Sequence, residues 1–548
     1  MMKKFFISIL IIILLIAGGG FFFLTRRGTN ETSQKYKEFS FISEGNDIDK
    51  KDFAKIDGQY YLSLNFIKNN IDDSVHYDKK EKTVTFTNDA GTSRYVVNEK
   101  QGLKNSQKIE LRDPIIEENG EIYIPLEAFI QDYPVKVRYI KDKKLLLLDR
   151  TDVEYAVGTP TGDGVNMREK DSKNSPVVAI LNKDDKVYVY GEEGDFYLVR
   201  QKDGYVGYIK KNLLKVDYAK DLFKTKKTSE KKEAVKPLNL TWDYTYGPEK
   251  KEKIDTISKI PGLDIICPTW FSVSNNNGDL IDRGSSEYVQ KYNSLGIKVW
   301  GYLDNSFNPE ITHNVLSSTS KREKVIAKTL ELAKKYNMPG INLDFEHINT
   351  EDRDNYTQFV RELSAQFHAE NIKVSVDVTP QISSDVKKEK YNREEIAKVA
   401  DYVVVMAYDQ HWKNSSEAGS VAEYKWVESN INMLFRSIPY DKMILGVPLY
   451  SRLWTEKGDK VTSSTLSMQQ ANDIMLKHKL TPKWDKVAKQ DYVEFKDANA
   501  TYKIWLENAS SIKYKVSLVN KYNLAGVGSW RKGFETPDIW NVIEDTLK

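Results

Sequence analysis

From Leu238 to the C-terminus, short apolar segments alternate with amphipathic ones, and this alternation restricts the fold more than any other feature of the chain. The apolar segments are LNLTWDYTY, LDIICPTWFSV, IKVWGYLDNSF, GINLDFEHI, IKVSVDVTP, YVVVMAYDQHW, MILGVPLYSRLW and GVGSWRKG. Short apolar runs bounded by turn residues indicate buried strands, and strands separated by helices form parallel sheets. Eight such units over about 300 residues predict an α/β fold, namely a (β/α)8 TIM barrel.

One helix and one long gap stand out between these strands. Tyr356, Phe359, Leu363 and Phe367 recur at helical spacing, after Thr350, a residue type that caps helix N-termini. Residues 455–525 separate the last two predicted strands by more than one helix requires. We therefore expect an α+β insertion there, forming one wall of a cleft.

The segment GINLDFEHI places polar side chains at every second position: Asn342, Asp344 and Glu346. Alternate residues of a strand share a face, and in a barrel this face looks inward. Three polar groups on the inward face are costly without a function. Glu346 comes last, at the C-terminal mouth where barrel active sites lie. Neighbouring carboxylates raise one pKa, which predicts a protonated acid beside an ionised partner.

This segment resembles the fourth strand of glycoside hydrolase family 18, which carries D-G-x-D-x-D-x-E. The register here reads Pro339, Gly340, Ile341, Asn342, Leu343, Asp344, Phe345, Glu346. The last Asp and the catalytic Glu of the family are present, whereas Pro339 and Asn342 replace its first two acids. The form G-[LIV]-N-[LIV]-D-F-E is similar to the branch containing bacterial spore and cell-wall lytic N-acetylglucosaminidases.

Other segments support the resemblance from Leu238 onward. VVVMAYDQHW is similar to the M-x-Y-D motif of the family's sixth strand, through Met406, Tyr408 and Asp409. LGVPLYSRLW resembles its seventh strand and GVGSWRKGFETPDIW its eighth. YKIWLENASSIKYKVSLV resembles the segment that precedes the eighth strand in this branch.

The resemblance implies a mechanism and a set of catalytic residues. Glu346 would protonate the glycosidic oxygen and later activate water, while the substrate's own acetamido oxygen attacks the anomeric carbon. Asp344 would orient the acetamido N–H, and Tyr408 would donate to its oxygen. No cofactor is implied.

The expected substrate-binding residues are aromatic and polar side chains near the strand ends. Trp530 is the expected stacking platform at the barrel floor, and for Trp412 and Trp454 sugar contact and core packing remain open. The full set is Asn342, Met406, Asp409, Trp412, Trp454, Trp530, Glu507, Trp270 and Tyr302.

The first 27 residues read as a transmembrane signal anchor. An apolar run from Phe5 to Thr25 lies between Lys3-Lys4 and Arg26-Arg27 and is long enough to span a bilayer. A cleaved signal peptide is the alternative. We expect a single-pass membrane protein whose C-terminal domains are extracytoplasmic, in the cell wall.

Three further regions precede the predicted barrel at 238–548. Residues 40–150 contain a repeat: a strand, a short helix and a hairpin begin at Asp57 and again at Asn119. This region resembles the N-terminal domain of copper amine oxidases, and we expect a two-repeat stalk. Residues 151–217 resemble a bacterial Src-homology-3-like domain, a small β barrel that either binds the wall or acts as a spacer. Lysine-rich residues 218–237 are a predicted linker.

Composition excludes several classes of function. The net charge of +3 gives no nucleic-acid footprint. Cys267 is the single cysteine, so no intrachain disulfide can form, and six scattered histidines predict no metal site.

Three functions remain compatible with the sequence. The first is a membrane-anchored hydrolase that cleaves β-1,4 bonds after N-acetylglucosamine in peptidoglycan, by substrate-assisted retaining catalysis. The second is a chitinase or another hydrolase of N-acetylglucosamine polymers. The third is an inactive, lectin-like barrel that binds glycans. The sequence leaves open vegetative wall or spore cortex as substrate, endo or exo cleavage, and the oligomeric state.

Overall fold

The computed structural model describes residues 28–217, 223–225, 236–245, 247, 250–381, 385–497 and 499–548. The chain divides into two compact units: unit 1 is Met1–Asp73 with Leu111–Lys231, and unit 2 is Ser74–Glu110 with Lys232–Lys548. The expected anchor at 1–27 and most of the expected linker at 218–237 lie outside the described residues. Within the part of the chain that is described, no helix is both long and apolar enough to cross a membrane.

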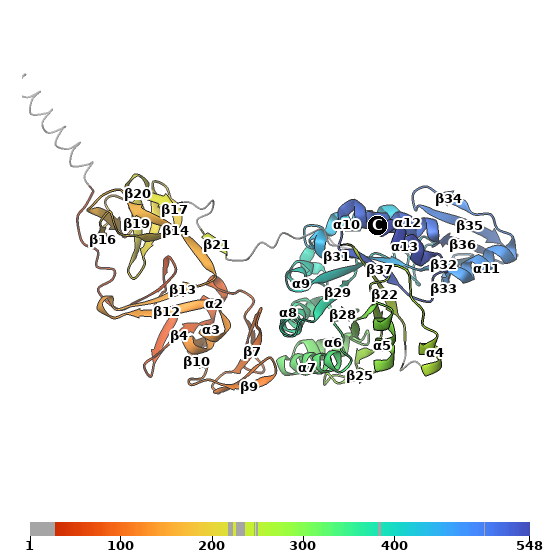
Figure 1. The fold of residues 1–548 in the computed structure, drawn as a ribbon, viewed down its shortest axis with the longest axis horizontal. Helices are drawn as coiled ribbons and strands as arrows, with labels where there is room; N and C mark the ends of the chain where they lie inside the picture. The colour runs from red at the N-terminus through yellow and green to blue at the C-terminus, as the bar shows by residue number, and fades with distance from the viewer. Residues whose placement is uncertain are drawn as a thin grey trace, which may run out of the picture. The chain divides into compact units, whose positions relative to one another are not determined.

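Unit 2 is built on a mainly parallel sheet that curls round on itself, here called the curled sheet (Figure 1). Its strands are β22 (Leu238–Asp243), β23 (Ile265–Pro268), β24 (Phe271–Val273), β25 (Leu280–Asp282), β26 (Lys298–Val299), β27 (Gly301–Asp304), β28 (Gly340–Asp344), β29 (Lys373–Val378), β30 (Tyr402–Met406), β31 (Met443–Pro448) and β37 (Gly526–Trp530). Each of the eight predicted segments contains at least one of these strands. Parallel pairing runs from β27 through β28, β29, β30, β31, β37 and β22 to β23. β23 also pairs with β26, and a single residue separates β26 from β27.

Helices cover the outer side of the curled sheet (Figure 1). They are α4 (Lys251–Asp255), α5 (Ser286–Ser294), α6 (Pro309–Leu316), α7 (Thr319–Lys335), α8 (Arg353–Ala369), α9 (Arg393–Val399), α10 (Tyr424–Leu434), α12 (Ala509–Tyr522) and α13 (Ile539–Leu547). The apolar stripe predicted around Tyr356 is buried on α8. However, the helix begins at Arg353 rather than after Thr350, because residues Thr350–Asp352 form a separate 3-10 turn.

The two faces of β28 enter different environments, as the alternation predicts. Ile341, Leu343 and Phe345 belong to the large apolar core between the curled sheet and its helices. Phe345 stacks on Tyr356 and Phe359 of α8, with ring centroids 5.4 and 5.3 Å away. The opposite face of β28 is turned into the curled sheet. Alternation along this strand therefore determines which side chains reach the interior.

A second, smaller sheet is inserted after β31. It contains β32 (Tyr450–Lys457), β33 (Lys460–Ser467), β34 (Lys483–Asp485), β35 (Gln490–Lys496) and β36 (Thr501–Leu506), with α11 (Met468–His478) between β33 and β34. The sequence predicts an α+β insertion over 455–525; the structure begins it at Tyr450 and uses residues from 509 onward for α12, which packs against β31 and β37.

Unit 1 contains most of the predicted repeat and the small β domain. The repeat region has β1 (Ser40–Ser43), β2 (Asn46–Asp47), β3 (Phe53–Ile56), β4 (Gln59–Ser63), α2 (Leu64–Asn70), β10 (Ile116–Glu118), β11 (Glu121–Pro125), α3 (Leu126–Asp132), β12 (Val135–Ile140) and β13 (Leu145–Arg150). The small β domain has β14 (Val153–Pro160), β15 (Val165–Arg168), β16 (Val177–Leu181), β17 (Val187–Glu193), β18 (Phe196–Gln201), β19 (Val206–Lys210), β20 (Leu214–Asp217) and β21 (Phe223–Thr225). β4 and β11, the first strands of the two repeats, pair with each other in antiparallel fashion.

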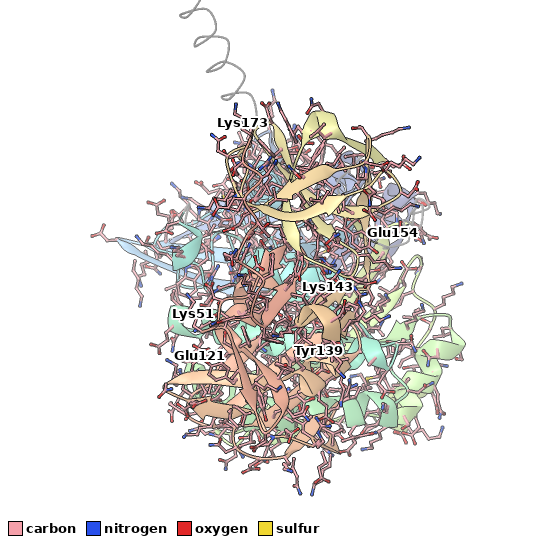
Figure 2. All side chains as sticks on the ribbon, turned by 90° about the vertical axis from the view of Figure 1, so that its left-hand side faces the viewer. Lys51, Glu121, Tyr139, Lys143, Glu154 and Lys173 are labelled. Carbon is pink, nitrogen blue, oxygen red and sulfur yellow. The ribbon has the colours of Figure 1, made fainter. Side chains whose placement is uncertain are left out.

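The surface of unit 1 carries both signs of charge (Figure 2). Lys51, Glu121 and Lys143 lie on the repeat region, and Glu154 and Lys173 lie on the small β domain.

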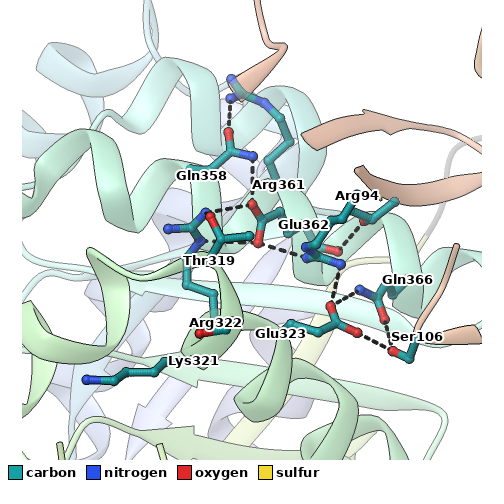
Figure 3. A network of polar contacts seen from close by, with 12 residues as sticks. Arg94, Ser106, Thr319, Lys321, Arg322, Glu323, Gln358, Arg361, Glu362 and Gln366 are labelled. Carbon is teal, nitrogen blue, oxygen red and sulfur yellow. Dashed lines mark hydrogen bonds and ion pairs between the residues drawn. The ribbon is translucent and has the colours of Figure 1, made fainter. Parts of the chain in front are cut away.

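The hairpin of the first repeat joins unit 2, where it starts a five-stranded sheet here called the arm sheet. Its strands are β5 (His76–Asp78), β6 (Thr83–Asn88), β7 (Gly91–Val96), β8 (Gln101–Lys104) and β9 (Gln107–Glu110). The arm sheet lies against α7 and α8 (Figures 1 and 3). Asp78 accepts hydrogen bonds from the backbone N–H and the hydroxyl of Thr319 at the start of α7, at 3.1 and 2.9 Å.

A buried ionic network joins the arm sheet to both helices (Figure 3). Arg94 of β7 donates to Glu362 of α8 at 3.0 Å and pairs with Glu323 of α7. Arg322 of α7 donates to both oxygens of Glu362, at 3.2 and 3.1 Å. Burial alone would raise the pKa of Glu362, but Arg322 and Arg94 lower it to about 2. This stabilisation is therefore present above the ordinary glutamate pKa and is lost as the pH falls toward 2.

We expect Arg94→Met to lower the free energy of unfolding of unit 2 by about 3–5 kcal/mol, because it leaves buried carboxylates without one cation. All ten tryptophans lie between residues 242 and 540, so denaturant unfolding followed by tryptophan fluorescence reports on unit 2 alone. Lys108→Met, on the exposed side of β9, is the matched control. Equal effects of the two substitutions would show that the network does not stabilise unit 2.

Candidate active site

A cleft of about 720 Å³ opens at the carboxyl ends of the strands of the curled sheet. Seven of the residues expected in the site line it: Glu346, Asp344, Tyr408, Met406, Asp409, Trp530 and Tyr302. They come from the ends of β27, β28, β30 and β37, which the parallel pairing brings to one edge of the sheet. The sequence therefore identified the location of the cleft and five of its polar side chains, those of Glu346, Asp344, Tyr408, Asp409 and Tyr302.

Glu346 lies two residues beyond the end of β28, and Asn305 holds its backbone. The Glu346 N–H donates to Asn305 Oδ1 at 3.1 Å, and Asn305 Nδ2 donates to the Glu346 carbonyl at 2.6 Å. Burial and the Asp409 carboxylate raise the pKa of Glu346 to about 6, against the opposing effect of Lys390. A carboxyl group with this pKa can hold a proton near neutral pH and release it to a substrate.

Asp344 lies beneath Glu346 and is almost fully buried. The hydroxyl of Tyr302 donates to Asp344 Oδ2 at 2.5 Å. Burial, followed by the charges of Glu346 and Asp377, raises the pKa of Asp344 well above its ordinary value. The site thus has the two interacting acids that the strand pattern predicts.

Asn342 was expected to bind substrate, but it is completely buried below the cleft. Its Oδ1 accepts from the indole N–H of Trp242 at 2.8 Å. Its Nδ2 donates to Ser375 Oγ at 3.0 Å and to Asp377 Oδ1 at 2.7 Å. Asn342 therefore orients the residues that line the floor instead of contacting the space above them.

Tyr408 and Asp409 follow β30 and border the cleft. Burial raises the pKa of Tyr408 well above its ordinary value, so its hydroxyl stays protonated and can donate. Asp409 Oδ1 accepts from the hydroxyl of Tyr450 and from Arg452 Nη2, each at 2.7 Å. These two partners belong to β32 and lie before the expected start of the insertion at 455. Within 455–525, Thr465 of β33 lines the cleft.

Aromatic rings form a platform at the cleft floor. Trp530 packs against Trp242 with ring centroids 5.8 Å apart, and against Tyr244 at 6.4 Å. All three line the cleft. Flat aromatic faces of this kind suit the apolar face of a sugar ring.

Four expected binding residues lie away from the cleft. Trp270 is buried against Tyr288 on the outer side of the curled sheet. Trp454 is buried and donates its indole N–H to the Gly419 carbonyl at 2.8 Å. Trp412 is 53% exposed on the surface. Glu507 is buried and paired with Lys515 of α12 at 2.9 Å, so that its charge is already neutralised.

The sequence reasoning missed several cleft residues: Trp242, Tyr244, Asp304, Asp377, Tyr450 and Arg452. Two of them had a recognisable signal. Asp304 and Asp377 each lie near the end of a predicted strand, in YLD and VDV, as Asp344 does in NLD. The rule that catalytic groups gather at the carboxyl ends of strands would have identified both.

Among the described residues, His313, Glu351 and Asp352 are close enough to share a metal ion. They lie outside the cleft, and Asp352 already contacts His313 Nδ1 at 2.9 Å and accepts from Asn355 at 3.2 Å. This group therefore gives no reason to place a metal in the active site.

A cleft in which an acid with a raised pKa lies beside a buried carboxyl group is an arrangement typical of glycosidases. The model of glycosyl hydrolases family 18 matches residues 287–534, that of the copper amine oxidase N-terminal domain matches 42–148, and that of the bacterial SH3 domain matches 163–215. The chain is 30% identical over 327 residues to the uncharacterized glycosylase YvbX of Bacillus subtilis, covering 57% of this chain and 93% of that protein. The chain belongs to glycosyl hydrolase family 18, whose members act on glycans that contain N-acetylglucosamine.

More distant relatives extend the comparison. The cortical fragment-lytic enzyme of Bacillus subtilis is 26% identical over 246 residues, covering 44% of this chain and 57% of that enzyme. The fold matches a chitinase from Chromobacterium violaceum (TM-score 0.51, 22% identity, 57% of this chain and 99% of the other). It also matches the spore cortex-lytic enzyme of Bacillus cereus (TM-score 0.52, 21% identity, 57% and 74%).

We expect kcat/KM to begin to fall above a pH of about 6, at first tenfold for each pH unit, because Glu346 acts only while protonated and its pKa is about 6. The pH profile of turnover of a fluorogenic N-acetylglucosamine oligomer measures this limb. A limb centred near the ordinary glutamate pKa, or a flat profile, would contradict the assignment of Glu346 as the acid.

Asp409→Asn should move the same limb toward lower pH, because the substitution removes the anion that raises the pKa of Glu346. The shift is measured with the same substrate across the same pH range. An exposed substitution of identical chemistry, Asp354→Asn, is the control and should leave the limb in place. A limb that Asp409→Asn left unmoved would show that this anion does not tune Glu346.

Proposed function

We propose that this protein is a membrane-anchored hydrolase that cleaves β-1,4 bonds after N-acetylglucosamine in peptidoglycan. The observation that supports it most directly is the pair of half-buried Glu346 and buried Asp344 at the cleft, where Glu346 has a pKa of about 6. The relatives known as cortical fragment-lytic enzymes favour a wall glycan over other polymers.

The reaction would proceed with help from the substrate. Glu346 protonates the glycosidic oxygen, and the substrate's acetamido oxygen attacks the anomeric carbon from the other face to give an oxazolinium ion. Asp344 accepts a hydrogen bond from the acetamido N–H, and the hydroxyl of Tyr408 donates a hydrogen bond to the acetamido oxygen. Glu346, now a carboxylate, removes a proton from the incoming water, so the anomeric configuration is retained.

The proposed fold is a closed barrel of eight strand positions. The pairing of β23 with β26, together with that of β24 with β27, supports closure between the second and third positions. Closure would give the cleft a rigid floor on which the acids and Trp530 keep fixed positions.

The proposed location is the cell membrane, with the described domains in the wall layer. The apolar run at residues 1–27 supports the anchor. The repeat region and the small β domain would hold the catalytic unit at a distance from the membrane, and the small β domain is a candidate for wall binding.

A chitinase is the second candidate. A specific similarity favours it: the chain is 27% identical over 270 residues to human di-N-acetylchitobiase, covering 41% of this chain and 69% of that enzyme. The residues at the cleft floor would act on chitin in the same way, so substrate choice depends on contacts further along the glycan.

The test compares vegetative wall, spore cortex and chitin oligomers as substrates, with products analysed by mass spectrometry. We expect wall or cortex fragments that end in reducing N-acetylglucosamine in the β configuration. Glu346→Gln should reduce turnover at least about 100-fold, since it removes the general acid.

Other products would point elsewhere. Fragments ending in reducing muramic acid would contradict the proposed bond, and turnover of chitin alone would favour the chitinase. Binding of wall glycan by the wild-type protein without turnover would indicate a lectin.

A further inference from the structure

Three aspartates lie side by side across the cleft floor. The register pairs Asp304 with Asp344 between β27 and β28. On the other side, Leu343 pairs with Val376 between β28 and β29, which places Asp344 next to Asp377 one residue further on. Neighbouring strands are about 4.8 Å apart, and all three carboxyl groups line the same cleft. Asp344 and Asp377 therefore face each other at short range.

One oxygen of each acid in this pair is already occupied. Tyr302 donates to Asp344 Oδ2 at 2.5 Å, and Asn342 donates to Asp377 Oδ1 at 2.7 Å. The other two oxygens, Asp344 Oδ1 and Asp377 Oδ2, are buried and accept no hydrogen bond from any described residue. Two buried carboxylate oxygens cannot both remain anionic and unpartnered, but a single proton placed between them satisfies both.

The orientation of Asn342 determines where that proton can lie. Its Oδ1 accepts from Trp242 at 2.8 Å, so its Nδ2 must be the atom that faces Ser375 and Asp377. An amide N–H cannot accept, and Asp377 Oδ1 is thereby used as an acceptor. The proton of Asp377, when present, is consequently on Oδ2, the oxygen that Asn342 does not contact.

We propose that Asp344 and Asp377 hold one proton between Asp344 Oδ1 and Asp377 Oδ2, and that Asp377 is a positioning residue for catalysis. With the proton on Asp377, Asp344 is the anion and accepts the substrate's acetamido N–H. The pair has one negative charge instead of two, so Glu346 above it keeps its own proton until it protonates the leaving group. The catalytic part of this inference rests on the proposed function; the shared proton does not.

The surroundings of the pair support a shared proton. The titratable groups that interact with it are Tyr302, Asp304, Glu346, Tyr356, Tyr391, Tyr408 and Cys267, all neutral or acidic. Burial and neighbouring acids raise the pKa of both members of the pair. No cation in this set offsets a second negative charge.

Infrared spectroscopy of the full chain tests the proton directly, without substrate. Glu346→Gln serves as the background, because it removes the protonated carboxyl of Glu346. Adding Asp377→Asn should abolish one protonated-carboxyl C=O band at neutral pH, whereas adding the exposed Asp354→Asn should abolish none. An unchanged band with Asp377→Asn would overturn the proposal.

Kinetics then test the positioning role. An asparagine at 377 can donate to Asp344 as the protonated acid does, so Asp377→Asn should keep kcat within about threefold of wild type. Asp377→Ala removes the donor and should lower kcat about 100-fold with a smaller change in KM. At alkaline pH the wild type should lose activity in two deprotonation steps, of which Asp377→Asn retains only that of Glu346.

The possible outcomes separate the two hypotheses. If Asp377→Asn loses as much activity as Asp377→Ala, or if Asp377→Ala is fully active, the shared proton has no catalytic role and the proposal is overturned. If the wild type turns over no glycan at all, the proposed function fails, while the infrared bands still decide whether the proton is shared.

Discussion

The catalytic unit depends on the burial of carboxyl groups at one level of the curled sheet. Removing an ionised carboxylate from water is costly, and the cost rises when a second acid lies beside it. The fold offsets this cost with neutral hydrogen-bond donors, namely the hydroxyl of Tyr302 and the amide of Asn342. Neutral donors stabilise the acids without neutralising them, so the acids remain available for proton transfer.

The position of the acid also depends on the other face of its strand. Phe345, between Asp344 and Glu346, stacks on the aromatic rings of α8. Further along α8, Glu362 is bound by Arg94 of the arm sheet (Figure 3). The arm sheet therefore contributes to the packing that backs the catalytic strand, although a domain boundary drawn from sequence repeats assigns it to the stalk.

Periodicity along the chain predicted the elements and the orientation of their side chains well. Alternation in β28 correctly separated the residues that face α8 from those that face the interior, and it located Glu346 at the cleft. Contacts between segments that are distant in the sequence could not be predicted from this periodicity. Trp454 has the same parity on β32 as Tyr450 and Arg452, which line the cleft, but a loop containing Gly419 covers it. The ion pair between Glu507 and Lys515, which neutralises the glutamate, could likewise not be predicted from the sequence.

Asn342 stands where the motif of the family has an aspartate, and it shows that a motif compared along one strand leaves out the acids of the neighbouring strands. In a parallel sheet, the residue beside Asp344 on the next strand is about 5 Å away. The residue two positions along the same strand is further away, at about 6.5 Å. A carboxyl group on the neighbouring strand can therefore lie as close to Asp344 as one at position 342 would. Asn342 then directs its amide toward Asp377 because Trp242 occupies its oxygen. The amide at 342 and the carboxyl group at 377 thus form one hydrogen-bonded arrangement, which becomes evident only when residues are compared across strands.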